Sequence, residues 1–381
     1  MKIAFLSTFY PFRGGIAQFN AKLVRELQKA HEVHALTFTR QYPKLLFPGK
    51  TQYVAVGDTA DAIEAVPVLD SINPWTYCRT AARLRQLQPD LLVTRFWMPF
   101  FAPSLGTVAG RLRKQGVITI SILDNVVPHE RRPGDDILIR YFLNRHDGFV
   151  VMTRAVEAEL NYYKRGAQYV LQPHPVYDHF PAPMPKAEAR QKLGIPQDKK
   201  VLLFFGFIRK YKGLDLALKA LTRLPSDYWL LVAGEVYGDF KPYQQIIDDY
   251  RLHSRVRLVL DYIPDPEVPA YFSAADVLVL PYRSATQSGI MQIAYHYHLP
   301  AIVTDVGGLA EMVEHGVTGL VLPRTDPELL AAMVRDYFSA HLREPFSQNM
   351  QKRKKRYSWP VFADALLALY HRLKREQTSR S

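Results

Sequence analysis

Short apolar runs alternate with longer amphipathic segments along nearly the whole chain, and this alternation restricts the possible folds more than any other feature. Residues 3–7 form such a run, and residues 16–29 follow it with apolar positions at helical spacing. A strand followed by a helix is the repeating unit of a parallel sheet. The pattern continues with apolar runs at 91–94, 117–123 and 148–152 and helical segments at 103–115 and 156–163. The first part of the chain is therefore predicted to be an α/β domain with a parallel sheet.

A proline-rich stretch interrupts the pattern near the middle of the chain. Prolines crowd residues 173–185, where their fixed φ and missing N–H disfavour regular structure. The alternation then restarts, with predicted strands at 200–206, 229–234, 256–260, 277–281 and 301–304 and helices at 214–221 and 243–253. We predict an N-terminal domain at residues 1–175, a linker at 176–198, a second α/β domain at 199–358 and a final helical segment at 359–381.

Length and cysteine content agree with two domains in a reducing compartment. The chain has 381 residues, of which 48% are hydrophobic, enough for two sizeable cores. Cys78 is the one cysteine, so neither an internal disulfide nor a cysteine-based metal site is expected. The first apolar run reaches Tyr10-Pro11 without a cleavage site, and no apolar stretch approaches the roughly 18 residues that span a bilayer. These features predict a cytoplasmic protein.

The formal net charge of +13 predicts an anionic partner. Such a partner could be an anionic lipid, a nucleic acid or a phosphorylated substrate. No nucleic-acid-binding module is recognisable, so a nucleic-acid partner is not predicted. Basic residues of the first domain could form a face that contacts an anionic membrane at its periphery, although such charges are more often simply solvated. The candidate residues are Arg79, Arg83, Arg85, Arg111, Arg113 and Lys114.

Open α/β sheets bind ligands beyond the carboxyl ends of their strands, so the loops there are candidate sites. Gly14 and Gly15 follow the first strand, where glycines bring backbone N–H groups close to an anion; a plain tight turn is the alternative. In the second domain, the loop that begins at Gly206 carries Arg209 and Lys212. These two cations can converge on one diphosphate, and a solvated basic loop is the alternative.

Small polar residues follow the predicted strand at 277–281. Thr286, Gln287, Ser288 and Gly289 precede a predicted helix and offer backbone and side-chain donors to a phosphate or a sugar. Helix capping by Thr286 or Ser288 is compatible with that role.

Taken in order, these motifs resemble the donor half of the family 4 (group 1) glycosyltransferases. The motifs are Gly206-Phe207-Ile208-Arg209 with Lys212-Gly213, residues 286–289, Pro300, residues 304–311 and Gly316-x-Thr318-Gly319. The Gly14-Gly15 loop and residues 124–130 resemble the family's acceptor half. The resemblance implies the α/β fold called GT-B, with two Rossmann-like domains facing a central cleft. The first would bind the acceptor, the second the nucleotide sugar, and the last helix would pack back on the first.

By this resemblance, the chain is a retaining glycosyltransferase. It would move a sugar from a nucleoside diphosphate sugar to a hydroxyl of a lipid-linked or saccharide acceptor. Arg209 and Lys212 would stabilise the leaving diphosphate, with N–H groups of Gly15 and of residues 287–289 adding donors. Since these charges take the place of a metal ion, no metal and no other cofactor is implied.

The donor half departs from the family's pattern at two positions. Thr286 and Ala294 stand where the family usually has two glutamates. Gln287 and Gln292 are candidates to replace them as neutral hydrogen-bonding groups. The missing glutamates support an alternative, a catalytically inert homologue that binds a nucleotide sugar or a partner protein.

The acceptor half has its own departure, because Asp124 stands where the family often has a histidine. Asp124 and His129 are both candidates for contacting the donor sugar or for accepting the acceptor's proton. The alternative for His129 is a hydrogen-bonded turn residue. Residues 95–101 are interpreted as an apolar strand-to-helix segment of the core, or else as a surface that touches lipid.

Overall fold

The computed structural model describes residues 1–43, 52–54, 62–128, 131–177, 180–285 and 288–379. Its internal contacts divide the chain into two compact units. Unit 1 contains Met1–His174 together with Ser358–Ser381, and unit 2 contains Pro175–Tyr357.

The described part of unit 1 holds a seven-stranded parallel sheet in the order β3-β2-β1-β4-β5-β6-β7. Its strands are β1 (Lys2–Leu6), β2 (Glu32–Arg40), β3 (Val66–Asp70), β4 (Leu91–Phe96), β5 (Ile118–Leu123), β6 (Gly148–Val151) and β7 (Gln168–Leu171). The central strands β4, β5 and β6 are buried along their whole length, as their continuous apolar runs predict.

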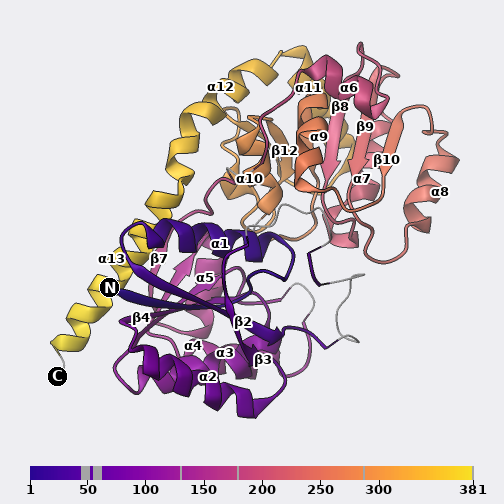
Figure 1. Cartoon of the computed structure of the whole chain (residues 1–381). Coiled ribbons are helices and arrows are strands. Elements are labelled where there is room, and N and C mark those ends of the chain that lie inside the picture. The colour runs from indigo at the N-terminus through magenta and orange to yellow at the C-terminus, as the bar shows by residue number, and fades with distance from the viewer. Residues whose placement is uncertain (44–51, 55–61, 129–130, 178–179, 286–287, 380–381) are drawn as a thin grey trace. The chain divides into compact units, whose positions relative to one another are not determined.

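Helices cover both faces of this sheet (Figure 1). They are α1 (Gly15–Gln28), α2 (Pro74–Leu87), α3 (Ala102–Arg113), α4 (Asp135–Leu143), α5 (Arg154–Tyr163) and α13 (Trp359–Thr378). Helix α2 begins at a proline and is capped by Asn73, whose side chain accepts a hydrogen bond from the Trp75 N–H. Helices α2, α3 and α4 pack in a row, and α1 packs against α13.

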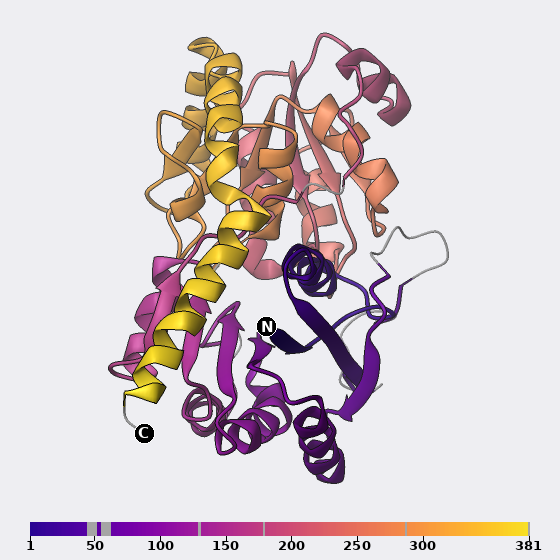
Figure 2. The same ribbon diagram turned by 60° about the vertical axis from the view of Figure 1, so that its left-hand side comes forward.

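Helix α13 comes from the far end of the chain and packs against β5, β6 and β7 (Figure 2). Gly148 permits this approach, because a Cβ atom there would lie 2.7 Å from Leu373 Cδ1. The buried side of the helix consists of Trp359, Phe362, Ala363, Leu366, Leu369, Tyr370 and Leu373.

The described part of unit 2 holds a six-stranded parallel sheet in the order β10-β9-β8-β11-β12-β13. Its strands are β8 (Lys200–Phe205), β9 (Tyr228–Ala233), β10 (Val256–Val259), β11 (Val277–Leu280), β12 (Ala301–Thr304) and β13 (Gly319–Leu322). Its helices are α6 (Lys186–Leu193), α7 (Leu214–Leu221), α8 (Lys241–Asp249), α9 (Val268–Ala274), α10 (Gly289–His296), α11 (Pro327–Ser339) and α12 (Arg343–Arg353). Helix α6 lies in the range predicted as a linker and begins directly after Pro185.

The prediction of two α/β parts with parallel sheets is confirmed. In each sheet the strand order reverses once, between β1 and β4 in unit 1 and between β8 and β11 in unit 2. Loops diverge at such a point and leave a crevice at the carboxyl edge, where doubly wound sheets bind ligands. The loops after β1, β4, β8 and β11 are therefore the candidate site elements.

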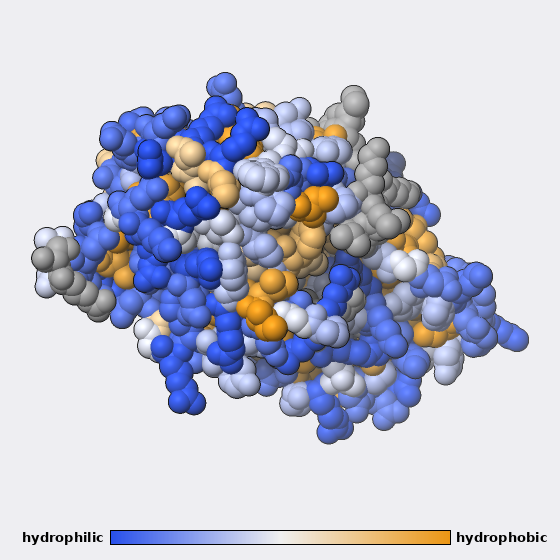
Figure 3. All heavy atoms as spheres, turned by 90° about the horizontal axis from the view of Figure 1, so that it is seen from below, coloured by the Kyte–Doolittle hydropathy of each residue, from blue (hydrophilic) through white to orange (hydrophobic). Residues whose placement is uncertain are grey.

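The molecular surface is largely hydrophilic on the face seen in Figure 3, with separate smaller apolar areas. Among the described residues, no helix has the length and apolar character that would let it cross a membrane.

Candidate functional site

Lys212 is the central cation of the candidate site in unit 2. It ends the short 3-10 helix η3 (Lys210–Lys212) between β8 and α7, and it is only 8% exposed. Its Nζ lies 5.4 Å from the centre of the Tyr282 ring. A Cβ atom built on Gly206 would lie 3.3 Å from this Nζ and 3.0 Å from Ile290 Cδ1, so backbone and an apolar side chain enclose the ammonium group.

No carboxylate forms an ion pair with Lys212 in the part of the chain that the structure describes. Burial, with the nearby Arg209 as the second cause, lowers the pKa of Lys212 to about 7. A buried cation without a counter-charge is unfavourable unless a ligand supplies one. The geometry therefore suits an anionic ligand.

Two glycines explain why the loop after β8 adopts this shape. Gly206 and Gly213 have φ angles of 94° and 72°, in the region that favours glycine. A Cβ atom on Gly213 would lie 2.1 Å from the carbonyl oxygen of Pro281, the residue directly after β11. Close packing at Gly213 therefore holds η3 against the loop that follows β11.

Arg209 supplies a second positive charge in the same loop. Its guanidinium carbon lies 4.8 Å from the centre of the Tyr237 ring, a cation–π contact that orients the side chain. Tyr237 in turn packs against Phe207 with ring centres 4.6 Å apart. The Lys212 backbone N–H donates to the Arg209 carbonyl oxygen at 2.9 Å, which ties the two cationic residues into one turn.

The amino end of α10 lies beside this turn. Ser288 is its N-cap residue and is 6% exposed, and Gly289 begins the helix. The first N–H groups of a helix have no partner within it and attract anions. Since Ile290 contacts Gly206 near the Lys212 ammonium group, this helix end and Lys212 border the same space. Thr286 and Gln287 lie outside the described residues.

Gln292 and Ala294 are both fully buried in α10. The Gln292 Nε2 lies 3.8 Å from Met312 Sδ, and its Oε1 is buried without a hydrogen-bond partner in the described structure. The structure therefore places Gln292 against the segment after β12, and no contact joins its side chain to Lys212. Ala294 has no polar side chain to offer a ligand.

In unit 1, Gly14 and Gly15 at the end of the loop after β1 are exposed. Gly14 has a φ angle of 110° and is the N-cap residue of α1, and the space beside its Cα is open. The Gln18 N–H donates to the Gly14 carbonyl oxygen at 3.2 Å. Gly14 and Gly15 thus form an accessible helix amino end at the reversal point of the first sheet.

Asp124 directly follows β5 and forms a buried ion pair with Arg95 of β4. The Arg95 Nε and Nη2 donate to the two carboxylate oxygens at 2.6 and 2.5 Å. The residues are 2% and 7% exposed. Such a two-pronged pair fixes the orientation of the carboxylate.

Further contacts extend this ion pair to α1. The Arg95 Nη1 donates to Asn20 Oδ1 at 3.2 Å, and the guanidinium carbon lies 3.9 Å from the centre of the Phe19 ring. Asn20 Nδ2 donates to Ser7 Oγ and to the Thr8 carbonyl oxygen, both at 2.9 Å. The network therefore joins the ends of β1, β4 and β5 to α1.

Glu159 of α5 holds the backbone that follows Asp124. Its Oε2 accepts hydrogen bonds from the N–H groups of Val126 and Val127, both at 3.0 Å. Burial raises the pKa of Glu159, and these two hydrogen bonds oppose the rise. His129 lies outside the described residues.

Two family models match the chain in tandem. The model described as glycosyl transferase 4-like domain matches residues 14–173, and the one described as glycosyl transferases group 1 matches residues 185–356. The chain belongs to the family 4 (group 1) glycosyltransferases.

Curated relatives of this chain match it over different lengths. A D-inositol 3-phosphate glycosyltransferase from Thermobifida fusca is 29% identical over 351 residues, which are 85% of this chain and 80% of the relative. D-inositol 3-phosphate glycosyltransferase 1 from Catenulispora acidiphila is 28% identical over 200 residues. That match spans 49% of this chain and 48%, or about half, of the relative.

A solved structure with the same architecture is that of Anabaena HepE in complex with UDP. The TM-score is 0.72, the sequence identity is 16%, and the match covers 100% of both chains. This similarity shows the shared GT-B fold.

Sequence reasoning missed three residues of the candidate sites, which are Arg95, Glu159 and Tyr237. Arg95 was assigned to an apolar core segment, and the structure does bury it there, but as one half of an ion pair. A charged residue within an apolar run is a usable signal, since buried charges require partners. Glu159 and Tyr237 carry no comparable local signal.

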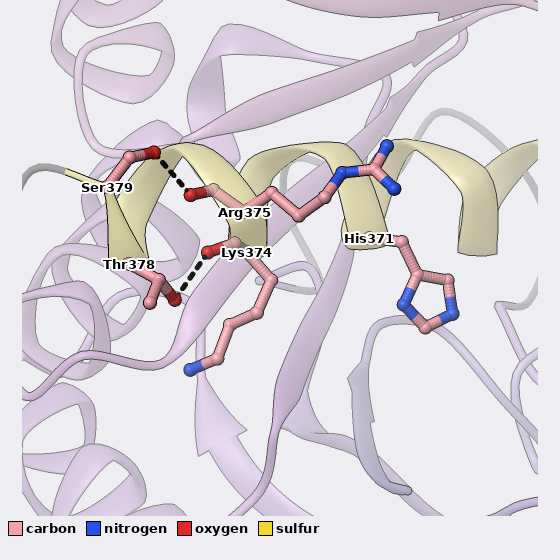
Figure 4. A pocket seen from close by; sticks show the side chains of 5 residues that line it. All are labelled: His371, Lys374, Arg375, Thr378 and Ser379. Atoms are coloured by element: carbon pink, nitrogen blue, oxygen red, sulfur yellow. Dashed lines mark hydrogen bonds between the residues drawn. The ribbon is translucent and has the colours of Figure 1, made fainter.

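Within the described ranges, no three His, Cys, Asp or Glu side chains gather as a group that could hold a metal ion. A hollow beside the end of α13 is lined by His371, Lys374, Arg375, Thr378 and Ser379 (Figure 4). Its two hydroxyl groups donate to carbonyl oxygens four residues earlier in the same helix. The hollow therefore shows no arrangement suited to chemistry.

Proposed function

We propose that this glycosyltransferase moves a hexose-type sugar from a nucleoside diphosphate sugar to a hydroxyl of a lipid-linked or saccharide acceptor. The observation that carries the proposal is the buried Lys212 ammonium group, which has no carboxylate partner in the described structure and lies at the reversal point of the second sheet. UDP is bound by HepE, a protein with the same fold, which supports a nucleotide donor.

Lys212 and Arg209 would act on the leaving diphosphate. As the bond between the anomeric carbon and the diphosphate oxygen breaks, negative charge grows on the phosphate. Two fixed cations and the amino end of α10 stabilise that charge without needing to reorganise. Because they supply the positive charge, we propose a reaction that requires no metal ion. Gly206, Ser288 and Gly289 would contribute backbone or hydroxyl donors, and Thr286, Gln287 and Gln292 remain proposed donor contacts.

Unit 1 would orient the reacting hydroxyl groups. Gly14 and Gly15 offer N–H groups, and the Asp124 carboxylate can accept hydrogen bonds from the donor sugar or the acceptor. Arg95 engages both oxygens of that carboxylate, so orientation suits it better than free proton transfer. His129 remains a proposed partner in proton transfer. We further propose that the product retains the anomeric configuration of the donor, as the family generally does.

Membrane contact is proposed through α2. Trp75 is 81% exposed at the start of this helix, and Arg79 and Arg83 follow at four-residue intervals on the same exposed side. No carboxylate of the described chain pairs with either arginine. An exposed tryptophan with unpaired cations suits a peripheral contact with an anionic bilayer at the cytoplasmic face.

Thermal unfolding with nucleotide sugars tests the donor site. UDP-glucose, GDP-mannose, ADP-glucose and dTDP-glucose are added separately, with EDTA present. A ligand that binds only the folded protein raises Tm, so one nucleotide class is expected to raise it. Arg209→Ala and Lys212→Ala should each weaken binding roughly 10- to 100-fold, the loss of a charge-assisted hydrogen bond. Lys210→Ala, an exposed neighbour, serves as the control.

Assaying the same mixtures for nucleoside diphosphate distinguishes a transferase from a catalytically inert homologue. The inert homologue is the alternative suggested by Thr286 and Ala294, which stand where the family usually has two glutamates. Slow hydrolysis, in which water takes the sugar and the nucleoside diphosphate is released, supports catalysis if Lys212→Ala abolishes it. Binding without any release would instead support the inert homologue. The absence of a Tm shift with all four sugars would contradict the donor site itself.

A further inference from the structure

The space around Lys212 contains positive charge but no negative charge in the described part of the chain. Arg209 lies in the same turn, and its guanidinium group is permanently charged. The nearest acid along the sequence, Asp215, is engaged by Arg283, whose two terminal nitrogens donate to its oxygens at 2.8 and 2.6 Å. Gly206, Ile290 and the Tyr282 ring complete the surroundings. In the free protein, these surroundings therefore favour the neutral, deprotonated form of Lys212.

A bound donor reverses this balance. The diphosphate of a nucleotide sugar brings two negative charges into a space that now holds only cations and dipoles. Opposite charges within a few ångströms favour the charged form of a lysine. We propose that Lys212 takes up a proton when unit 2 binds its nucleotide sugar, so that donor binding is coupled to pH. This inference rests on the donor site proposed above.

Other titratable groups near Lys212 do not account for the same proton. Burial raises the pKa of Tyr282, with the Ser288 side chain opposing the rise, so the phenol stays protonated. Tyr211 packs against Tyr282 with ring centres 6.2 Å apart. Burial opposes but does not prevent the lowering of the Asp215 pKa by Arg283, so this acid stays ionised. Lys212 is the group left to titrate.

The direction of the pH effect follows from the two states of Lys212. Its pKa is about 7 in the free protein, and the diphosphate raises it in the complex. Well below pH 7, Lys212 is already charged and binding takes up little proton. Above pH 7, binding must add the proton, so affinity falls by up to about tenfold per pH unit until the pKa of the complex is reached.

Isothermal titration calorimetry measures this proton directly. The sugar nucleotide that raises Tm in the panel is titrated into wild-type protein, at each pH in two non-phosphate buffers that have different ionisation enthalpies. A nucleotide sugar is the right probe because its diphosphate is esterified at both ends, whereas a terminal phosphate has its own ionisation near pH 6. We expect clear proton uptake near pH 8 and much less near pH 6.

Lys212→Arg provides the decisive comparison. Arginine remains charged, so this variant should bind the donor with no proton uptake at either pH. Lys210→Arg makes the same change two residues away on an exposed side chain and should keep the wild-type uptake.

Binding by the wild-type protein without proton uptake would overturn this inference while leaving the donor site intact. Equal uptake in wild type and Lys212→Arg would overturn it as well, since another group would carry the proton. The wild-type measurement decides the question even if Lys212→Arg does not fold. No binding by any of the four sugars would instead count against the proposed function.

Discussion

Arg95 and Asp124 show how a single pair of residues supports the candidate site of unit 1. Both are almost completely buried, and together they join three strand ends to α1. Arg95→Met would leave the carboxylate buried without its partner, which typically costs about 3–5 kcal/mol. We expect chemical denaturation to show that loss in the free energy of unfolding. The double variant Arg95→Met/Asp124→Leu should lose less than Arg95→Met alone, because no buried charge remains.

A surface pair in the same unit provides the matched control. Arg113 donates to Asp147 at 2.6 Å, but its side chain is 46% exposed. Arg113→Met should therefore cost only about 0–1 kcal/mol. Equal losses for Arg95→Met and Arg113→Met would show that burial of the Arg95–Asp124 pair has no energetic importance.

At the residue scale, sequence reasoning selected candidates by chemical type and motif. Arg209 and Lys212 could be chosen because cations at a strand end suit a diphosphate, and the structure brings them into one turn. Arg95 could not be paired with Asp124 from the sequence, since 29 positions separate them and only the strand order makes them neighbours. The burial of Lys212 was equally invisible, because it depends on packing at Gly206 and Ile290.

At the scale of a single element, α2 is the helix proposed to contact the membrane. Trp75→Ala together with Arg79→Gln and Arg83→Gln should reduce binding to vesicles that contain phosphatidylserine. Each basic residue near an anionic surface contributes about 1 kcal/mol, so the two charges alone predict a loss of roughly 10- to 30-fold. Cosedimentation with phosphatidylserine vesicles and with neutral phosphatidylcholine vesicles measures the difference.

A second helix serves as the control for that experiment. Tyr162, Arg154 and Arg165 are exposed on α5 and in the turn after it. The control variant Tyr162→Ala/Arg154→Gln/Arg165→Gln therefore removes one aromatic ring and two positive charges, as the α2 variant does. It should bind the vesicles as the wild type does. Equal losses in the two triple variants would mean that net charge, and not α2, attracts the protein to the vesicles.

Elements with strong periodicity were predicted within a few residues, and weaker ones were not. The segment predicted at 16–29 is α1, and the run at 117–123 is β5. Strand β3 was missed because it is short, lies at the sheet edge and contains Pro67. Helix α6 was missed because prolines just before it were taken to extend an irregular segment, although a proline often precedes or begins a helix.

For the whole molecule, the two parallel sheets follow from the alternating pattern, but their strand orders do not. Order depends on which strands pair across long stretches of chain, and local periodicity does not encode that choice. The reversal points between β1 and β4 and between β8 and β11 therefore had to come from the structure. They explain why the Gly14 loop and the Lys212 loop occupy equivalent places in their own sheets.

A shortened chain tests the dependence of unit 1 on its last helix. Ending the chain at Tyr357 removes α13 and uncovers the surface of β5, β6 and β7 that it buries. Loss of its buried side chains, each contributing about 1.5–3 kcal/mol, would exceed the roughly 5–15 kcal/mol stability of an ordinary domain. Limited proteolysis should then degrade unit 1 and leave unit 2 resistant.

Ending the chain at Thr378 is the control, since α13 remains whole. That protein should resist proteolysis as the full chain does. Persistence of unit 1 in the chain that ends at Tyr357 would show that the helix is dispensable.

The position of α13 at the end of the sequence also affects when each unit can complete its folding during translation. Residues 1–174 are synthesised first, yet their sheet lacks one of its covers until Ser358–Ser381 leave the exit tunnel. Unit 2 is continuous in sequence and can finish earlier. We therefore expect the second half of the nascent chain to fold before the first, with the uncovered sheet of unit 1 exposed to chaperones during translation.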